Sequence, residues 1–374
     1  MILTQCAVCA TELGLSSGKK CGRCSTRYCG PECQVQHWKE GGHDQLCKSI
    51  KKAGGAEQYN ANKKYTEAVA VAAEKCADDT KGQTCYICTQ ALHWKTKEGL
   101  VRGCACRGTA GFAHVSCLAE QAKILYAEAE ENNLDHKVKD ARWHRWHQCS
   151  LCEQRYHGVV ACALTWACWK TYLGRPEGKW ARTAAMTTLA SGLFATGHYE
   201  DALSVQEAEL ATLQRVGASE ERILVAQNNL AATYARLGHF EPALRLKRDV
   251  YSGYLKLYGE DHRYTLEAAN NLVTSLLHAH LFEEAKALLR KTLPVARRTL
   301  GENDATMLRL RGNYAEALCK DPAATLDDLR ESVATLEEIE RTARRVLGGA
   351  HPTTTGIERA LQKYREVLAA REPR

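Results

Sequence analysis

The chemistry that this sequence can support lies first in its cysteines, which gather in two groups. Of the eighteen cysteines, seven fall within residues 1–47 and seven within residues 85–152, and each group has Cys-x2-Cys pairs and a histidine at ligand spacing. Two thiolates that face each other across a tight turn bind a tetrahedral ion, and zinc accepts such sulfur and nitrogen donors. Disulfides are not expected without a secretory context. The spacing therefore predicts two zinc-binding regions.

The first region offers eight candidate ligands, which is enough for two tetrahedral zinc ions. Its last two pairs have the spacing of one helical turn, which places both members of a pair on one face of a helix. A segment of this size cannot bury enough apolar surface to fold alone, so we expect the metal to supply the missing free energy. The candidate ligands are Cys6, Cys9, Cys21, Cys24, Cys29, Cys33, His43 and Cys47.

The second region also offers eight ligands, in the order four cysteines, one histidine and three cysteines. At its centre is "CACRGTAGFAHVSC", where two cysteines precede an unequally spaced His-x2-Cys pair. The third and fourth cysteines follow the first pair too closely for two sites to form one after the other, so interleaved sites are predicted. One ion takes Cys85, Cys88, His114 and Cys117, and the other takes Cys104, Cys106, Cys149 and Cys152. The two regions together predict four zinc ions per chain.

Composition sets the class of protein that carries these sites. The chain has 374 residues, 45% hydrophobic and 25% charged, with a net charge of +7. These values are typical of a globular protein of two or three domains, and no dense basic stripe indicates nucleic acid as a partner. The opening "MILTQCAVCA" does not resemble a signal peptide, and the apolar stretch 158–169 is too short to span a bilayer. We expect a soluble cytoplasmic protein without a membrane partner, with the nucleus as the alternative compartment.

The chain from about residue 181 onward is helical and repetitive. The motif "GHYEDAL" at Gly197 returns as "GHFEPAL" at Gly238 and as "HLFEEAK" at His280, with a period of about 42 residues. A fixed period in this range indicates stacked pairs of helices. Glycines that recur between the helices permit the left-handed turn that ends a helix. These glycines are Gly217, Gly259, Gly301 and Gly348.

The segment "RYCGPECQVQHWKEGGHDQLC", which begins at Arg27, resembles the core of a MYND zinc finger. MYND fingers generally recognise short proline-containing peptides, so the resemblance implies a peptide partner. It also implies that His37, beside Trp38, is a packing residue and not a ligand. The ligand sets implied are Cys6, Cys9, Cys29 and Cys33 for one ion, and Cys21, Cys24, His43 and Cys47 for the other.

The order of ligands in the second region fits both PHD fingers and RING-CH fingers. The stretch "CACRGTAGFAHVSCL" is similar to the RING-CH signature, and "CSLCEQRYHG" at 149–158 is similar to its closing turn and trailing tyrosine. A PHD finger usually has tryptophan where this chain has His147. RING-CH proteins are typically ubiquitin ligases, so the resemblance implies that a ubiquitin-conjugating enzyme docks around Ile87 and the segment after Cys117. The chain departs from the family at Gln121, where tryptophan is usual.

The register "NNLA-x2-Y-x3-G-x-F-x2-AL" at 228–244 resembles the tetratricopeptide repeat in the form typical of kinesin light chains. "YGEDHRYT" and "LGGAHPTT" resemble the turn between repeats of that form. The fourth unit departs from the pattern, because "CKDPAATLDDL" replaces the glycine-aromatic turn and inserts five residues. Stacked repeats build a concave surface for peptide or protein partners. Asn228 and Asn270 are predicted either to face this surface or to bridge neighbouring helices.

We therefore predict a mainly α fold, in which two small cross-braced zinc fingers precede an α-solenoid of tetratricopeptide-type helix pairs. A further helix is expected in "AEQAKILYAEAEENN", within the second finger. The expected domains are a MYND finger at 1–52, a helical linker at 53–84, a RING-CH finger at 85–158, a connecting helix at 159–180, and at 181–374 a repeat array of about four units with a C-terminal capping helix.

Several histidines and cysteines fall outside the ligand patterns. The remaining cysteines lie in helical runs and are expected to behave as small buried apolar residues; they are Cys76, Cys162, Cys168 and Cys319. The remaining histidines of the second region are expected to pack or to face solvent, and those beside Cys149 are the substitutes if a ligand is misassigned. They are His93, His136, His144 and His147.

Three functions are consistent with these motifs, and none of them requires a catalytic side chain. The first is a ubiquitin ligase, in which the RING-CH finger recruits the charged conjugating enzyme while the repeats and the MYND finger hold the substrate. The second is a non-enzymatic adaptor that joins proteins through its fingers and repeats. The third is a reader of methylated histones through a PHD-like finger, which requires an aromatic cage near residues 85–152.

Overall fold

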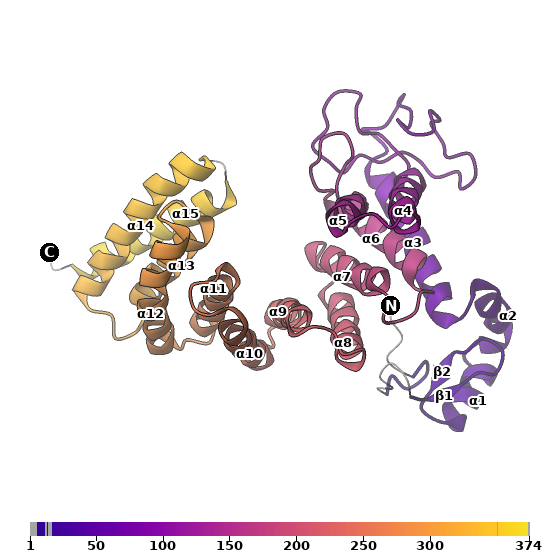
Figure 1. The fold of residues 1–374 in the computed structure, drawn as a ribbon, viewed down its shortest axis with the longest axis horizontal. Helices are drawn as coiled ribbons and strands as arrows, with labels where there is room; N and C mark the ends of the chain where they lie inside the picture. Colours follow the sequence, from indigo (N-terminus) through magenta and orange to yellow (C-terminus); the bar gives the residue numbers. More distant parts are fainter. Residues whose placement is uncertain (1–5, 12, 14–16, 350, 373–374) are drawn as a thin grey trace. The chain divides into compact units, whose positions relative to one another are not determined.

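The computed structural model describes residues 6–11, 13, 17–349 and 351–372 (Figure 1). This part of the chain forms fifteen α-helices and one two-stranded sheet, which confirms a mainly α fold with cysteine-rich fingers ahead of helical repeats. The chain divides into two compact units, of which the first ends at Ala218 and the second begins at Ser219. Both fingers lie in the first unit. The domain limits expected from the motifs differ from this division and stay predictions.

The first finger begins with a short antiparallel hairpin. Strand β1 (Lys19–Lys20) pairs with β2 (Arg27–Tyr28), and helices α1 (Pro31–Lys39) and α2 (His43–Ala53) follow. Proline at the first position of α1 suits a helix start, because the N–H that it lacks would have no partner in the helix. The apolar core of the finger is small, and four of its eight buried members are predicted ligands: Cys6, Leu13, Cys21, Cys24, Tyr28, Cys47, Ile50 and Ala56.

The second finger is mostly loop in its first half and helical in its second. Helix α3 (Ala56–Lys75) precedes it, and α4 (Val115–Glu131), α5 (His136–Trp143) and the short 3-10 helix η1 (His144–Trp146) lie within it. Helix α4 confirms the helix expected between the sixth and seventh ligands. The side chain of Asp135 caps α5 by accepting a hydrogen bond from the backbone N–H of Val138 at 3.0 Å.

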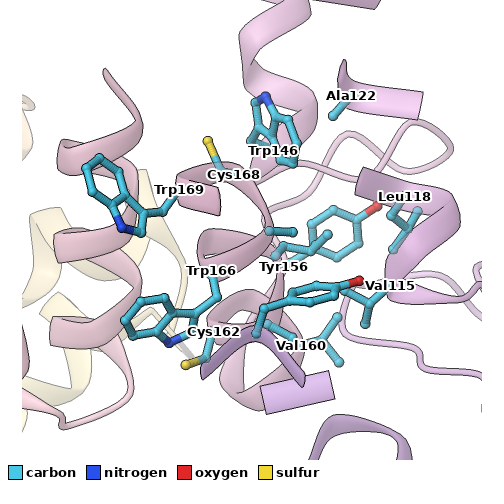
Figure 2. Packing of buried hydrophobic residues seen from close by; sticks show 14 of the residues in the cluster. Val115, Leu118, Ala122, Trp146, Tyr156, Val160, Cys162, Trp166, Cys168 and Trp169 are labelled. Atoms are coloured by element: carbon cyan, nitrogen blue, oxygen red, sulfur yellow. The ribbon is translucent and has the colours of Figure 1, made fainter. Parts of the chain in front are cut away.

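The apolar residues of the second finger join a core that it shares with the surrounding helices. Helix α6 (Gly158–Tyr172) packs against α3 and α7 (Trp180–Ala195), and α7 packs against α8 (Tyr199–Arg215). Figure 2 shows Trp166 and Trp169 of α6 in the same cluster as Trp146 and Val115 of the finger. Helices that precede and follow the finger in sequence therefore support it.

Helix α6 contains the apolar stretch noted in the sequence, and protein surrounds it. Its fifteen residues are fewer than the ~20 that a span requires. Across the described ranges, no helix has both the length and the apolar character needed to cross a membrane. Cys162 and Cys168 on this helix are buried, and burial raises the pKa of both thiols. These cysteines therefore behave as the expected apolar core residues.

The second unit is a succession of helices, each packed against the next. Glycine in a left-handed or extended positive-φ conformation ends three of them at the predicted places, Gly259, Gly301 and Gly348. A side chain is strained in this conformation, so glycine is favoured there. The helices are α9 (Glu220–Arg236), α10 (Phe240–Tyr258), α11 (Arg263–His278), α12 (Phe282–Leu300), α13 (Ala305–Lys320), α14 (Leu326–Leu347) and α15 (Pro352–Arg371).

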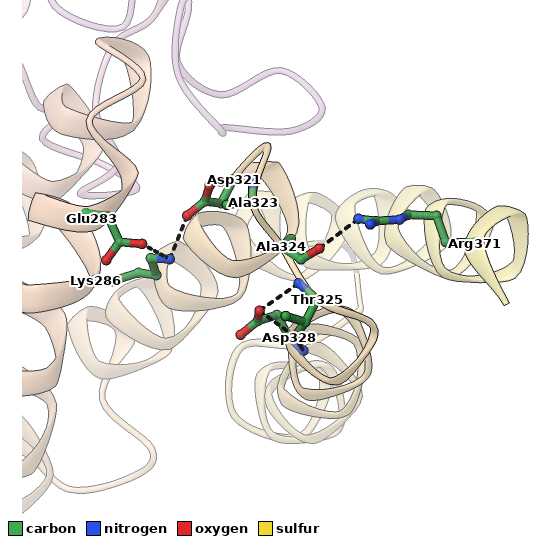
Figure 3. A network of polar contacts seen from close by, with 8 residues as sticks. All are labelled: Glu283, Lys286, Asp321, Ala323, Ala324, Thr325, Asp328 and Arg371. Carbon is green, nitrogen blue, oxygen red and sulfur yellow. Dashed lines mark hydrogen bonds and ion pairs between the residues drawn. The ribbon is translucent and has the colours of Figure 1, made fainter.

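The irregular fourth repeat has a defined structure, held by a polar network (Figure 3). The Nζ atom of Lys286 on α12 donates to Asp321 Oδ2 at 2.6 Å, and both side chains are largely buried. This hydrogen bond lowers the pKa of Asp321. A reciprocal pair of hydrogen bonds between Thr325 and Asp328 then starts α14. The inserted residues thus form a fixed turn in place of the glycine-aromatic turn of the other repeats.

Candidate metal centres

Four tight turns, one at each Cys-x2-Cys pair, share one backbone geometry. Two backbone hydrogen bonds of 2.8–3.2 Å close each turn. In the first, the carbonyl of the first cysteine accepts the N–H of the residue four positions later, as Cys85 does from Thr89. In the second, the N–H of the first cysteine donates to the carbonyl of the residue five positions later, as Cys85 does to Gln90. The fifth residue of each turn, counted from the first cysteine, has a left-handed φ of 56° to 62°. We call these turns knuckles, and their left-handed residues are Ala10, Ser25, Thr89 and Glu153.

The first finger gathers its eight predicted ligands into two interleaved groups, as the MYND resemblance implied. In the more exposed group, the Sγ atoms of Cys9, Cys29 and Cys33 lie 3.4–3.7 Å apart. In the buried group, the Sγ atoms of Cys21 and Cys47 lie 3.9 Å apart. The groups are Cys6, Cys9, Cys29 and Cys33, and Cys21, Cys24, His43 and Cys47.

The second finger gathers its eight predicted ligands in the interleaved arrangement expected from their spacing. The Sγ atoms of Cys106 and Cys149, which are far apart in sequence, lie 3.8 Å apart. Gly111 makes this site possible, because a Cβ at this left-handed position would lie 2.6 Å from the Cβ of Cys106. The groups are Cys85, Cys88, His114 and Cys117, and Cys104, Cys106, Cys149 and Cys152.

The donor geometry fits zinc. With Zn–S bonds of about 2.3 Å, tetrahedral sulfurs lie about 3.8 Å apart, and a sulfur and a histidine nitrogen lie about 3.5 Å apart. In this structure the sulfur–sulfur distances are 3.4–3.9 Å and the sulfur–nitrogen distances are 3.4–3.6 Å, and both ranges include the expected value. Each group supplies four protein donors within 4.8 Å of one another. Such sites are closed, and a closed site braces a fold and leaves no position for a reacting water.

The two histidines point different nitrogens at their sites. His43 places Nε2 3.4 Å from the Sγ of Cys24. His114 places Nδ1 3.4 Å from the Sγ of Cys88, which leaves its Nε2–H to donate to the carbonyl of Ala91 at 3.3 Å. Burial lowers the pKa of both imidazoles and so favours the neutral form that binds metal. The bond to Ala91 also fixes the ring orientation of His114.

The thiols differ in how easily they ionise. A hydrogen bond from the Thr11 hydroxyl lowers the pKa of exposed Cys9 to about 6. Burial acts to raise the pKa of Cys152, but bonds from the backbone of Gln154 and from Cys106 lower it to about 7. Burial, followed by neighbouring thiols, raises the pKa of Cys117 well above its usual range. Zinc binding must therefore release protons, and zinc affinity must rise with pH.

The remaining predicted or excluded residues lie outside the four groups. The ring of His37 packs against His43, and its Nδ1 lies 3.0 Å from the Tyr28 hydroxyl, as expected of a packing residue. His144 and His147 pack against each other. Two exposed apolar residues beside the metal groups, Trp94 and Leu151, were not singled out in the sequence; neither has a spacing signature.

The two asparagines of the repeats bridge helices. Asn228 Oδ1 on α9 accepts hydrogen bonds from Lys247 on α10 at 2.7 Å and from Asn271 on α11 at 3.2 Å. Asn270 Oδ1 accepts one from Asn313 on α13 at 3.1 Å. Both residues therefore bridge helices, and Asn270 also lines a cavity of the second unit.

Comparison with protein families identifies three segments of the chain. Residues 6–47 match the MYND finger, and residues 182–256 and 265–304 match two models of the tetratricopeptide repeat. The chain therefore contains a MYND finger and tetratricopeptide repeats. None of the three ranges includes the second finger, so its RING-CH resemblance stays a prediction. No curated protein sequence matches the chain.

Comparison with solved structures also finds matches. A putative kinesin light chain from Podosopora anserina with nearly identical TPR-like repeats has 18% sequence identity and a TM-score of 0.42, covering 62% of this chain and 97% of its own. BtubC (BKLC) from P. vanneervenii has 12% identity and a TM-score of 0.38, covering 70% and 92%. The yeast Sti1 TPR2AB domain, solved with a pHSP90 partner, has 12% identity and a TM-score of 0.24, covering 67% and 99%.

A MYND finger, four clusters consistent with zinc binding, and tetratricopeptide repeats together indicate a zinc-binding protein that interacts with other proteins or peptides. The repeats supply the surface for such partners.

Proposed function

We propose that this chain is a ubiquitin ligase, in which the second finger, a RING-CH-type module, binds a ubiquitin-conjugating enzyme. The repeats and the MYND finger hold the substrate. The proposal includes four zinc ions on the sixteen ligands named above and the domain limits predicted from the motifs. The observation that carries it is a pair of exposed apolar side chains at equivalent places on the two knuckles of the second finger.

These side chains are Ile87 and Leu151, which are 37% and 52% exposed. Each is the third residue of its knuckle, and each N–H donates to the Sγ of the first cysteine at 3.4 Å. The hydroxyls of the preceding residues, Tyr86 and Ser150, form a hydrogen bond of 3.0 Å that ties the two knuckles together. The two apolar side chains therefore belong to one rigid surface, and a preorganised apolar surface suits a protein partner.

Gln121, where RING-CH fingers usually have tryptophan, has an exposed apolar neighbour on the same helix. Gln121 is half-buried on α4, and Ile124, one turn further on, is 47% exposed. Residues three apart on a helix lie on neighbouring parts of its surface. Ile124 thus supplies an apolar side chain beside the position where the RING-CH resemblance expects tryptophan.

In this proposal the finger acts by positioning. The amine of a substrate lysine attacks the thioester of the charged conjugating enzyme, an isopeptide bond to ubiquitin forms, and the thiol of the conjugating enzyme leaves. The closed metal groups touch neither reacting atom. The finger holds the thioester in an attackable conformation, and such positioning alone can supply a large part of a rate enhancement.

The substrate side of the proposal rests on the second unit. A cavity of about 410 Å³ lies among α11, α13, α14 and α15. Its lining mixes hydrogen-bonding and apolar side chains, which suits a peptide better than a purely apolar ligand. Among these residues are Asn270, Arg309, Asn313, Glu316 and Tyr364.

The test is discharge of ubiquitin from a panel of purified conjugating enzymes by the full zinc-loaded chain. The double variant Ile87→Ala with Leu151→Ala is expected to slow discharge by at least about tenfold. Its zinc content should not change, because both side chains are exposed. The control is Val71→Ala, which removes an exposed apolar side chain from α3. Equal rates in the chain and the double variant would contradict the proposed docking surface.

The alternative is a non-enzymatic adaptor, which the departure from the RING-CH signature at Gln121 favours. An adaptor predicts no discharge with any enzyme of the panel while zinc content is complete. The histone-reader alternative has less support: within residues 85–152, Tyr126 and Trp143 are buried and pack edge to face with ring centroids 5.0 Å apart. These two rings therefore form no open cage for a methylated lysine.

A further inference from the structure

A fifth turn in the second finger has the knuckle geometry without a cysteine pair. The N–H of Lys97 donates to the carbonyl of His93 at 2.9 Å, and the N–H of His93 donates to the carbonyl of Glu98 at 3.0 Å. Lys97 has a left-handed φ of 60°, like the fifth residue of each metal-binding knuckle. His93 and Thr96 occupy the places of the two cysteines.

Hydrogen bonds close this turn in place of a metal ion. The Nδ1 atom of His93 accepts the backbone N–H of Thr96 at 3.1 Å, and the Thr96 hydroxyl lies 2.8 Å from the same nitrogen. His93 is buried, and its ring packs against that of His114 at 5.3 Å. The turn is therefore fixed at its base by a predicted zinc ligand.

The far end of the turn is fixed to helix α4. The carboxylate of Glu98 accepts the backbone N–H of Ser116 at 2.7 Å and its hydroxyl at 2.8 Å. These bonds satisfy one of the free N–H groups at the start of α4. Because both oxygens of Glu98 accept these hydrogen bonds, the one carboxylate of the turn does not pair with Lys95 or Lys97.

This rigid turn presents an apolar and basic surface to solvent. Trp94 is 68% exposed and Leu92 is 58% exposed, the two largest exposures among the large apolar residues that the structure describes. Lys95 and Lys97 follow Trp94 on the same turn and are exposed. In the described ranges, no carboxylate forms an ion pair with either lysine. A tryptophan held on a preformed turn loses little entropy on binding, and tryptophan is enriched among residues that dominate binding energy.

We propose that Leu92, Trp94, Lys95 and Lys97 form a docking site for an acidic peptide segment of a partner protein, one that carries an apolar side chain beside carboxylates. The apolar side chain packs on Trp94 and Leu92, and the carboxylates lie near the two lysines, whose charge selects an acidic partner and speeds its association. This site shares no residue with the knuckle surface of Ile87 and Leu151 and does not depend on ligase activity.

The test uses a random dodecapeptide library displayed on phage, selected on the full zinc-loaded chain. Peptides with apolar residues next to aspartate or glutamate should be enriched. Labelled versions of these peptides should bind Trp94→Ala at least about tenfold more weakly, with partial recovery in Trp94→Phe. The double variant Lys95→Glu with Lys97→Glu should also bind weakly, and added salt should weaken binding to the unaltered chain. Val71→Ala is the matched control, and zinc content is measured for every variant.

Two outcomes overturn the proposal. One is enrichment of peptides without acidic residues, or no enrichment at all. The other is equal binding of the acidic peptides by Trp94→Ala and by the unaltered chain. If Trp94→Ala instead abolishes ubiquitin discharge and no acidic peptide is enriched, Trp94 belongs to enzyme docking and the peptide site is rejected. Failure of the ligase proposal alone, with no discharge but Trp94-dependent peptide binding, leaves the peptide site supported.

Discussion

The two fingers use the same knuckles and the same interleaved ligand order, yet they differ in what surrounds the metal groups. In the first finger, half of the small buried core consists of ligand sulfurs. In the second, ligand sulfurs are a minor part of a core that extends from Ala61 on α3 to Ala208 on α8. One finger is thus held together mainly by metal, and the other by metal and a helical core.

This difference shows that ligand spacing alone does not determine how far a finger depends on zinc. A short segment lacks enough apolar surface to offset its conformational entropy, so metal binding supplies its folding free energy. A finger packed on long helices obtains that free energy from buried tryptophans as well. The same motif can therefore be essential in one region of a chain and supplementary in another.

Removal of zinc should give the largest effect and separates the two fingers directly. Structural zinc contributes on the order of 10 kcal/mol in small fingers. We expect a chelator to abolish amide protection in residues 17–53, while α3, α4 and α6 keep most of theirs. Hydrogen exchange with mass spectrometry measures both regions in one sample. Equal loss of amide protection in the two fingers would contradict the conclusion that the first finger depends more on metal than the second.

Truncation of a buried apolar side chain should destabilise the second finger more than the first, the opposite of zinc removal. Trp146 is fully buried in the shared core, and Trp146→Ala is expected to cost about 3–5 kcal/mol even with saturating zinc. Leu13→Ala, in the first finger, should cost less while zinc is bound, because the metal groups hold that finger. Urea unfolding followed by local probes in each finger gives the two values. A larger loss of unfolding free energy for Leu13→Ala than for Trp146→Ala would contradict the idea that metal stabilises the first finger and the helical core stabilises the second.

A pair of glycines tests how tightly the second finger holds its metal group. Gly108 and Gly111 both have left-handed φ angles, but only at Gly111 would a Cβ meet Cys106. Either substitution by alanine should cost about 1 kcal/mol of backbone strain. Gly111→Ala should in addition lower zinc affinity, by roughly 10–100-fold if it acts like other changes next to ligands. Competition with a zinc indicator measures the difference, and equal affinities in the two variants would exclude the predicted clash.

The repeats provide a metal-free reference through Lys247. Burial without a carboxylate partner lowers the pKa of this lysine to about 8. The unfolded lysine keeps its proton up to a higher pH, so the unfolded state binds more protons above pH 8, and stability must rise with pH there. Relative to Lys247→Met, we expect a gain of about 1 kcal/mol between pH 7.5 and 9. Unfolding monitored in the repeats should show this gain in stability with and without chelator. If the gain disappears on chelation, the stability of the repeats depends on bound metal.

Much of this architecture could be predicted from local sequence signals. Ligand spacing predicted the candidate ligands and the two groups of the second finger, and the MYND resemblance implied the two groups of the first. Glycines such as Gly259 and Gly301 predicted helix ends, because this signal acts over a few residues. The shared core could not be predicted, since the contact between α3 and α6 joins segments about a hundred residues apart. The metal-free turn at His93 was also missed, because hydrogen bonds from Thr96 replace the second cysteine that a spacing search requires.

The left-handed residue of each knuckle has a consequence for how the fingers respond to zinc supply. Alanine, serine, threonine and glutamate occupy this position at Ala10, Ser25, Thr89 and Glu153, where glycine would be unstrained. The empty turns are therefore biased towards other conformations, and bound zinc must offset this strain at each knuckle. Exchange for glycine at one of these positions would remove that strain and lower the zinc concentration needed to close that knuckle.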